Sequence, residues 1–207
     1  MNKWLNIIIS GVASMGLLSA CNGIFDGIYD EPDNGSNNMG FENEGEIYID
    51  ATSYTNWVYI DFSKKSIVTL DYDKDAPKNW DIAVHRYDVK TNGAKVIETG
   101  YTEFDEAAKA TINQADLVGD VWTTSQIVID MSTMMDGYLG YTESYYNPEL
   151  SKWLNVDTST MPPIYQPSGK VYIVYLADGT RAGLKLINYM NDMQVKGYMT
   201  IQYMYPF

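Results

Sequence analysis

The chain has 207 residues and a formal net charge of −13, with 14 Lys and Arg side chains against 27 Asp and Glu. Binding to nucleic acid requires basic side chains that neutralise phosphates, so this charge balance excludes a nucleic-acid-binding protein. The single cysteine excludes an intrachain disulfide and a zinc site built on cysteines.

The N-terminal segment has the layout of an export signal. Lys3 precedes a stretch without charged residues, 4–18, and small residues follow it. This order predicts a signal peptide over residues 1–20. Leu18-Ser19-Ala20-Cys21 matches the lipobox of bacterial lipoproteins, so we predict that Cys21 is acylated and that only this anchor contacts the membrane. The alternative is a buried apolar strand that ends in a cysteine.

Residues 21–45 are predicted to be a flexible acidic tether. The run 30–38 is Asp-Glu-Pro-Asp-Asn-Gly-Ser-Asn-Asn, which has almost nothing to bury. The folded domain is therefore expected over residues 46–207.

Strand patterns dominate this domain. Alternation with a period of two, rich in Val, Ile, Thr and Tyr, predicts strands at 46–50, 57–62, 66–70, 80–86, 95–98, 126–130, 170–176, 182–189 and 197–205. Helices are expected only at 103–110 and 148–154, and Trp80, Ile82 and Val84 are expected on one strand face. These features predict an all-β fold: an antiparallel two-sheet sandwich-like domain with long loops and little helix.

Catalytic residue patterns are missing from the sequence. His85 is the only histidine, and no carboxylate pair stands out as an acid–base couple. We therefore expect a binding protein rather than an enzyme, with no catalytic residue. For His85 we favour a structural role at the sheet surface or in a polar network, and a metal-ligand role is the alternative.

A short motif occurs twice, 27 residues apart. Residues 130–134 and 157–161 both read Asp-x-Ser-Thr-Met, each in a stretch typical of a loop. Methionine is a soft thioether ligand for copper(I) or haem iron, so two such loops could grip a flat cofactor from both faces. The alternatives are methionines that fill gaps in the core, or a chance repeat.

Several motifs carry a family resemblance. Trp80-Asp81-Ile82-Ala83-Val84-His85-Arg86 is followed by Met135-Asp136-Gly137-Tyr138, by the block 150–165 with Ser159-Thr160-Met161-Pro162-Pro163, and by Ala177-Asp178-Gly179-Thr180. In this order the motifs resemble the HmuY-like haem-binding lipoproteins of the Bacteroidota, over most of residues 45–207.

The resemblance implies haem b (iron protoporphyrin IX) as cargo, passed to a TonB-dependent haem receptor of the outer membrane. It implies an outer-membrane lipoprotein at the cell surface, with release from the cell as a further option. Founding members of the family hold the iron with two histidines, a pattern that this chain with one histidine does not follow. Other members use two methionines, in loops that correspond to 131–137 and 158–163.

The resemblance therefore implies that Met161 and either Met134 or Met135 are the ligands of the iron. The repeated motif favours Met134, since Met134 and Met161 occupy its same position. Tyr138 and Tyr165, beside the two loops, are expected to contact the haem.

Lys152 is a candidate to bind a propionate group of the haem. Thioether ligation favours iron(II), so we expect haem to bind best under reducing conditions. The competing hypothesis is a surface β-domain without haem, of adhesin-like or glycan-binding type.

Overall fold

The computed structural model describes residues 38–39, 43–160 and 162–207. The predicted signal peptide, Cys21 and most of the predicted tether lie outside the described residues, and so does Met161.

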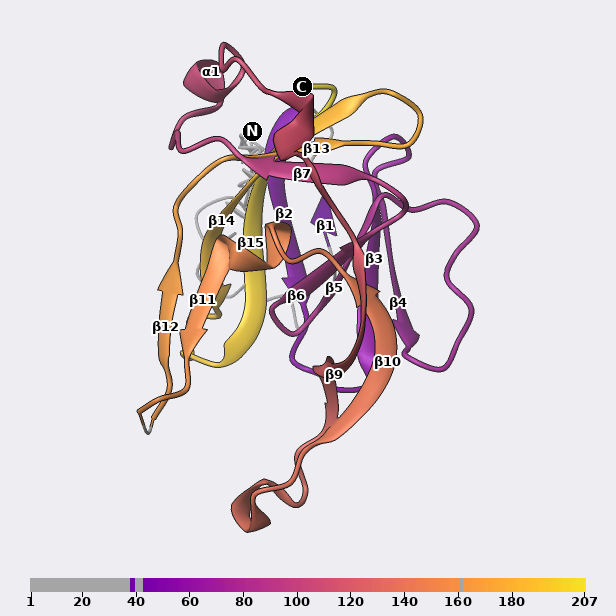
Figure 1. The fold of residues 1–207 in the computed structure, drawn as a ribbon, viewed down its shortest axis with the longest axis vertical. Coiled ribbons are helices and arrows are strands. Elements are labelled where there is room, and N and C mark those ends of the chain that lie inside the picture. Colours follow the sequence, from indigo (N-terminus) through magenta and orange to yellow (C-terminus); the bar gives the residue numbers. More distant parts are fainter. Residues whose placement is uncertain (1–37, 40–42, 161) are drawn as a thin grey trace, which may run out of the picture. The chain divides into compact units, whose positions relative to one another are not determined.

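Strands make up about half of the described chain (Figure 1). Their bounds are β1 Asn38–Met39, β2 Glu44–Asp50, β3 Asn56–Asp61, β4 Ser66–Asp71, β5 Ile82–His85, β6 Asp88–Thr91, β7 Lys95–Glu98, β8 Val118–Gly119, β9 Val121–Asp130, β10 Gly140–Tyr146, β11 Leu154–Asp157, β12 Ile164–Pro167, β13 Tyr172–Tyr175, β14 Arg181–Met190 and β15 Lys196–Met204. Among the described residues, helical structure is limited to α1 (Phe104–Ala107) and to the 3₁₀ turns η1 (Gln114–Asp116), η2 (Met134–Asp136) and η3 (Leu150–Trp153).

The strands form four sheets, and every pairing between described strands is antiparallel. One sheet has seven strands in the order β1-β2-β15-β14-β13-β7-β8, and another has four in the order β4-β3-β5-β6. The pairs β9–β10 and β11–β12 are separate two-stranded sheets. The predicted antiparallel all-β fold with little helix is confirmed.

The main core lies between the seven-stranded and four-stranded sheets. Alternation along β15 is regular, with every second side chain buried, and β2 buries Ile47 and Ile49. These side chains join Val58 and Ile60 of β3 in one cluster of buried residues. Period-two alternation places such residues on a single sheet face, which explains the sandwich-like architecture.

The four-stranded sheet also buries side chains on its other face. Trp57, Tyr59 and Ala83 form a second cluster with Ile127 of β9, so the β9–β10 hairpin packs on this face.

Trp80 packs against this second cluster, whereas Ile82 and Val84 belong to the main core. The prediction that Trp80 shares their face is wrong, because β5 begins only at Ile82 and the period-two rule does not reach back to residue 80.

The turn between β13 and β14 follows from its residue types. The amide of Leu176 donates to the carbonyl of Thr180 (2.9 Å), and Gly179 adopts φ +89°, a left-handed conformation that glycine takes without steric cost. The predicted Asp178-Gly179 hairpin turn is confirmed by the antiparallel pairing of β13 with β14.

No helix among the described residues is long and apolar enough to cross a membrane.

Candidate functional site

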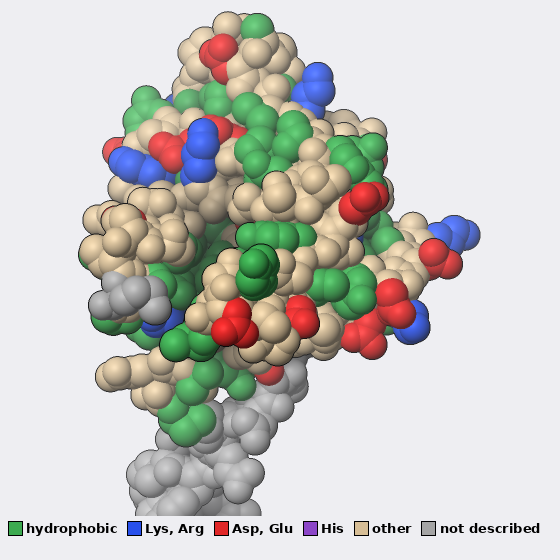
Figure 2. Space-filling model, turned by 60° about the horizontal axis from the view of Figure 1, so that its bottom comes forward, with side chains coloured by type: hydrophobic (Ala, Val, Ile, Leu, Met, Phe, Trp, Pro, Cys, Tyr) green, Lys and Arg blue, Asp and Glu red, His purple; other side chains and the backbone are tan. Residues whose placement is uncertain are grey.

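Two hairpins, β9–β10 and β11–β12, project from the same end of the domain (Figure 1). A cavity of about 1050 Å³ is lined by residues of both, which we call the hairpin cavity. Figure 2 brings this end forward and shows hydrophobic side chains over much of the face. The lining consists of Tyr54, His85, Arg86, Tyr87, Asp88, Gln126, Val128, Met131, Met134, Leu139, Tyr146, Pro148, Ser151, Lys152, Leu154, Asn155, Val156, Thr158, Pro163 and Tyr165.

The tip of the β9–β10 hairpin brings Met134 to the cavity. η2 forms this tip, and Gly137 ends it with φ +85°. Met134 lines the cavity and is 41% exposed, whereas Met135 is 90% exposed and does not line it. The segment is a 3₁₀ turn rather than an extended one, and with three residues per turn successive side chains point about 120° apart.

The opposite hairpin contributes the loop between β11 and β12. Thr158 and Pro163 line the cavity on either side of Met161, the predicted ligand that lies outside the described residues. Tyr165 of β12 also lines it. Tyr138, by contrast, is 72% exposed and is not part of the lining.

The repeated Asp-x-Ser motif forms the same local turn in both loops. The amide of Ser132 donates to Asp130 Oδ1 and that of Ser159 donates to Asp157 Oδ1, both at 2.8 Å. Hydrogen bonds from these serines lower the pKa of each aspartate. The turn stabilises the start of each loop, because an aspartate side chain accepts readily from the amide two residues on.

A stack of aromatic rings around Arg86 forms one wall of the cavity. The guanidinium lies 4.4 Å from the ring centroid of Tyr54 and 5.1 Å from that of Tyr87. Arg86 Nη1 also donates to the carbonyl oxygens of Thr52 and Ala51. These contacts fix Arg86 in the turn between β5 and β6, where it adopts φ +53°.

The ring stack continues through Tyr165. Its ring meets Tyr87 edge-on at 5.3 Å and stacks on Tyr189 at 5.5 Å. Lys196 Nζ lies 3.8 Å from the Tyr165 centroid. The wall of the cavity is therefore a preformed surface of tyrosine rings with cations on it.

His85 is buried at the edge of the cavity. Its Nε2 donates to the carbonyl oxygen of Tyr54 at 2.8 Å, and its ring lies 5.1 Å from that of Trp57. Burial lowers the pKa of His85 to about 4. A neutral imidazole fixed by a backbone carbonyl supports the structural interpretation of this histidine.

Two further charged groups border the cavity. Burial raises the pKa of Asp88 to about 6, against a hydrogen bond of 2.9 Å from Gln126 Nε2 that lowers it. Lys152 Nζ donates to Glu149 Oε2 at 2.6 Å, so an anion at this lysine competes with Glu149.

Sequence reasoning missed the wall residues Tyr54, Tyr87 and Asp88. Tyr54 precedes β3 and meets His85 across 31 positions of the chain, so no local pattern links them. Arg86 was identified only as part of a motif, whereas His85 was singled out as the only histidine and expected to have a structural role.

Comparison with known proteins gives the family. The HmuY protein family matches residues 53–203, and no protein with a curated description matches the chain. A solved structure from Bacteroides vulgatus, described as a candidate HmuY-like haem-binding protein, is 53% identical, with a TM-score of 0.76 over 83% of this chain and 98% of that one.

A candidate lipoprotein from Bacteroides fragilis is 47% identical, with a TM-score of 0.76 over 82% of this chain and 94% of that one. The apo form of an HmuY analogue from Tannerella forsythia is 24% identical, with a TM-score of 0.68 over 83% of this chain and 97% of that one, which supports the fold alone. The match over residues 53–203 and the identity with the first two structures show that this chain belongs to the HmuY family.

Proposed function

We propose that the chain is a haem-binding lipoprotein, a capture module rather than an enzyme, that holds haem b in the hairpin cavity. The observation that carries the proposal is this cavity of about 1050 Å³, lined by the tyrosine wall and by Met134, in a member of the HmuY family. Ligand cavities in proteins are typically about 300–1,000 Å³ and mostly apolar, so the volume suits a group as large as a porphyrin.

Met134 and Met161 are the proposed axial ligands of the iron. Met134 lines the cavity from one hairpin, and Thr158 and Pro163, in the same loop as Met161, line it from the other. Met135 stays the alternative to Met134, but its 90% exposure argues against it. A bound haem would supply the iron, and the thioether sulfurs of the two methionines would favour iron(II) and raise its reduction potential.

The cavity walls would orient the rest of the ligand. Tyr165 offers a ring face within a stack that is already formed, so little ordering is needed on binding. Tyr138 would have to move to make contact, since it lies outside the lining. Arg86 and Lys152 are the cations of the lining, and each is a candidate for a propionate.

A titration with haemin, under air and under dithionite, tests the proposal. We expect a Soret shift and a low-spin spectrum that is strongest after reduction. Met134→Ala and Met161→Ala should each weaken the low-spin bands, while the matched control Met135→Ala leaves them unchanged. Absence of a Soret shift in both states would refute haem binding, and damage confined to Met135→Ala would reassign the ligand.

The cellular part of the proposal concerns delivery. An acylated Cys21 would hold the domain at the outer membrane, from where haem passes to a TonB-dependent receptor. Cys21→Ser should move the protein from the membrane fraction to the soluble fraction and slow growth on haemin as the only iron source. A membrane-bound Cys21→Ser protein would contradict the anchor.

A further inference from the structure

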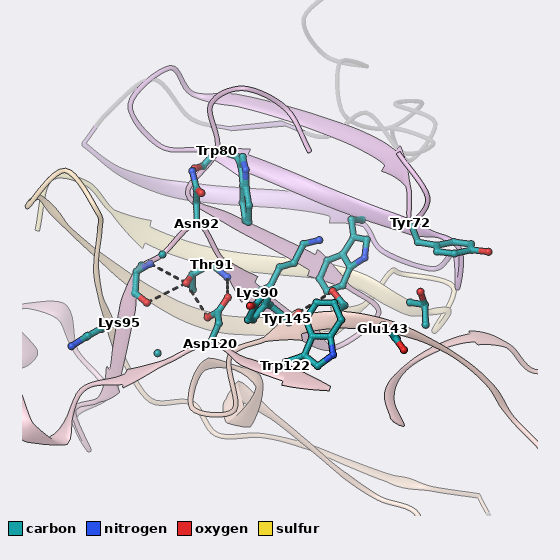
Figure 3. Close-up of a pocket in the computed structure, with 16 residues that line it drawn as sticks. Tyr72, Trp80, Lys90, Thr91, Asn92, Lys95, Asp120, Trp122, Glu143 and Tyr145 are labelled. Carbon is teal, nitrogen blue, oxygen red and sulfur yellow. Dashed lines mark hydrogen bonds between the residues drawn. The ribbon is translucent and has the colours of Figure 1, made fainter. Parts of the chain in front are cut away.

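A second cavity, of about 630 Å³, lies beside the other half of the β9–β10 hairpin (Figure 3). We call it the aromatic pocket. It is lined by Trp57, Tyr72, Trp80, Lys90, Thr91, Asn92, Gly93, Ala94, Lys95, Gly119, Asp120, Trp122, Thr142, Glu143, Ser144 and Tyr145. None of these residues lines the hairpin cavity, so the two sites are separate.

Large aromatic rings reach the pocket from two different sheets. Trp57 belongs to the four-stranded sheet and Trp80 precedes β5, whereas Trp122 and Tyr145 come from β9 and β10 (Figure 3). The rings of Trp122 and Tyr145 meet edge-on at 5.0 Å, and both side chains are 54% exposed. Exposed apolar side chains that are grouped in this way, rather than scattered singly, are typical of binding sites.

Lys90 places a cation inside this ring cluster. Its Nζ lies 3.9 Å from the Trp57 centroid and donates to the hydroxyl of Tyr59 at 3.2 Å. No carboxylate of the described residues lies within 4.0 Å of it. Burial lowers the pKa of Lys90 to about 8, as expected for a cation whose solvent has been removed without a full counter-charge.

The nearest carboxylate, Asp120, supplies only part of that counter-charge: it raises the pKa of Lys90, but by less than burial lowers it. Asp120 Oδ1 accepts from Thr91 Oγ1 and Asn147 Nδ2, and its Oδ2 accepts from the amide of Thr91. Glu143 is exposed. Lys90, which is half-buried among the rings and only partly compensated by Asp120, therefore still gains from an anionic partner.

The remaining lining suits hydroxyl groups. Asn92, Thr142 and Ser144 add amide and hydroxyl side chains to the aromatic surfaces. A pyranose ring has this dual character: its C–H faces carry a small positive charge that the negative face of an aromatic ring attracts, and its edge carries hydroxyls.

We propose that the aromatic pocket binds an acidic pyranose, a sugar ring that carries one carboxylate. The ring would lie against Trp122 and Tyr145, and the carboxylate would accept from Lys90 Nζ. The proposal does not depend on haem binding, because the hairpin cavity shares no lining residue with this pocket.

Calorimetric titrations with methyl β-glucuronide and with N-acetylneuraminic acid test the site, and methyl β-glucoside is the neutral control. We expect at least one acid to bind at least tenfold more tightly than the glucoside. Lys90→Met should abolish that preference and Trp122→Ala should weaken binding of the acid at least fivefold, while Lys109→Met, which removes an exposed lysine outside the pocket, changes neither. Equal binding of acid and neutral sugar, or no effect of Lys90→Met, would overturn the assignment, and so would absence of binding by both acids.

The pH dependence of sugar binding and competition with haemin test the pocket independently of the variants. Affinity for the acid should fall as the pH rises through about 8, because Lys90 loses its proton there. The other ionisable groups at the pocket are Tyr59, Tyr72, Lys95, Asp120, Glu143 and Tyr145. Haemin added to the sugar complex should leave sugar affinity unchanged, and displacement of the sugar by haemin would refute a separate site. Circular dichroism of each variant checks its fold, and the exposed Trp122 keeps the test decisive if Lys90→Met unfolds.

Discussion

Asp88→Asn should stabilise the protein, and more so at higher pH. Asp88 lies on β6 at the hairpin cavity, where burial raises its pKa from 3.8 to about 6. A folded-state pKa above the unfolded value means that the folded protein holds this proton more tightly. The stability that Asp88 contributes is therefore present below pH 3.8 and is lost as the pH rises through about 6.

The size of the stability change follows from the shift in the pKa of Asp88. About two pKa units correspond to roughly 3 kcal/mol at pH 8, where both states are ionised. At pH 5 the folded carboxyl is mostly protonated, so the cost falls to roughly half of that. Asparagine avoids the charge and keeps an oxygen that accepts from Gln126 Nε2, the partner of Asp88 at 2.9 Å.

Urea unfolding of the apo protein at pH 5 and pH 8 measures this difference. We expect the free energy of unfolding of Asp88→Asn to exceed that of the wild type by about 3 kcal/mol at pH 8 and by about half as much at pH 5. The exposed Asp192 gives the control Asp192→Asn, which should show no such gain. Equal gains at both pH values, or a loss at pH 8, would refute the reasoning.

Two further predictions concern the same wall of the cavity. His85 has a pKa lowered to about 4, so its contribution to stability is present above about pH 6.5 and is lost as the pH falls toward 4. In urea unfolding, the free energy of unfolding of His85→Gln should therefore fall by about 2 kcal/mol less than that of the wild type between pH 8 and pH 5. A variant with the same pH dependence as the wild type would contradict this prediction. Gly197→Ala should cost about 1–3 kcal/mol, because at φ +106° its Cβ would lie 2.8 Å from Arg86 Nη1 and 2.9 Å from the backbone Cα of Thr52. The matched control Gly169→Ala, at φ +63° with open space around it, should cost only about 1 kcal/mol, and equal losses in thermal unfolding would show that Arg86 is not displaced.

Strand β2 is one that the sequence predicted from a single buried face. Ile47 and Ile49 alternate with polar residues, so the period-two pattern identified β2 directly. Strands β10 and β12 were not predicted, because they belong to two-stranded sheets whose side chains are mostly exposed or half-buried. Such strands are held by pairing with a neighbour, which leaves no alternation in the sequence.

The candidate site could be predicted in its two loops and at Lys152 and Tyr165 near them, both of which line the cavity. The repeated motif singled out Met134, which lines the cavity, and Met161, whose assignment stays a prediction. Tyr54 and Tyr87 could not be predicted, because their place at Arg86 depends on the pairing of β3 with β5 and on the turn after β5. Such contacts arise from tertiary structure and leave no local pattern.

The β9–β10 hairpin separates the aromatic pocket from the hairpin cavity. Its half near Trp122 and Tyr145 borders the aromatic pocket, and its half near Val128 and Met134 borders the hairpin cavity. The ladder is irregular between Thr142 and Ser144, at the aromatic pocket, and no third strand of the described chain pairs with it. A shift in the register of these two strands would therefore change the shape of both cavities at once. The geometry of each cavity thus depends on the pairing of β9 with β10.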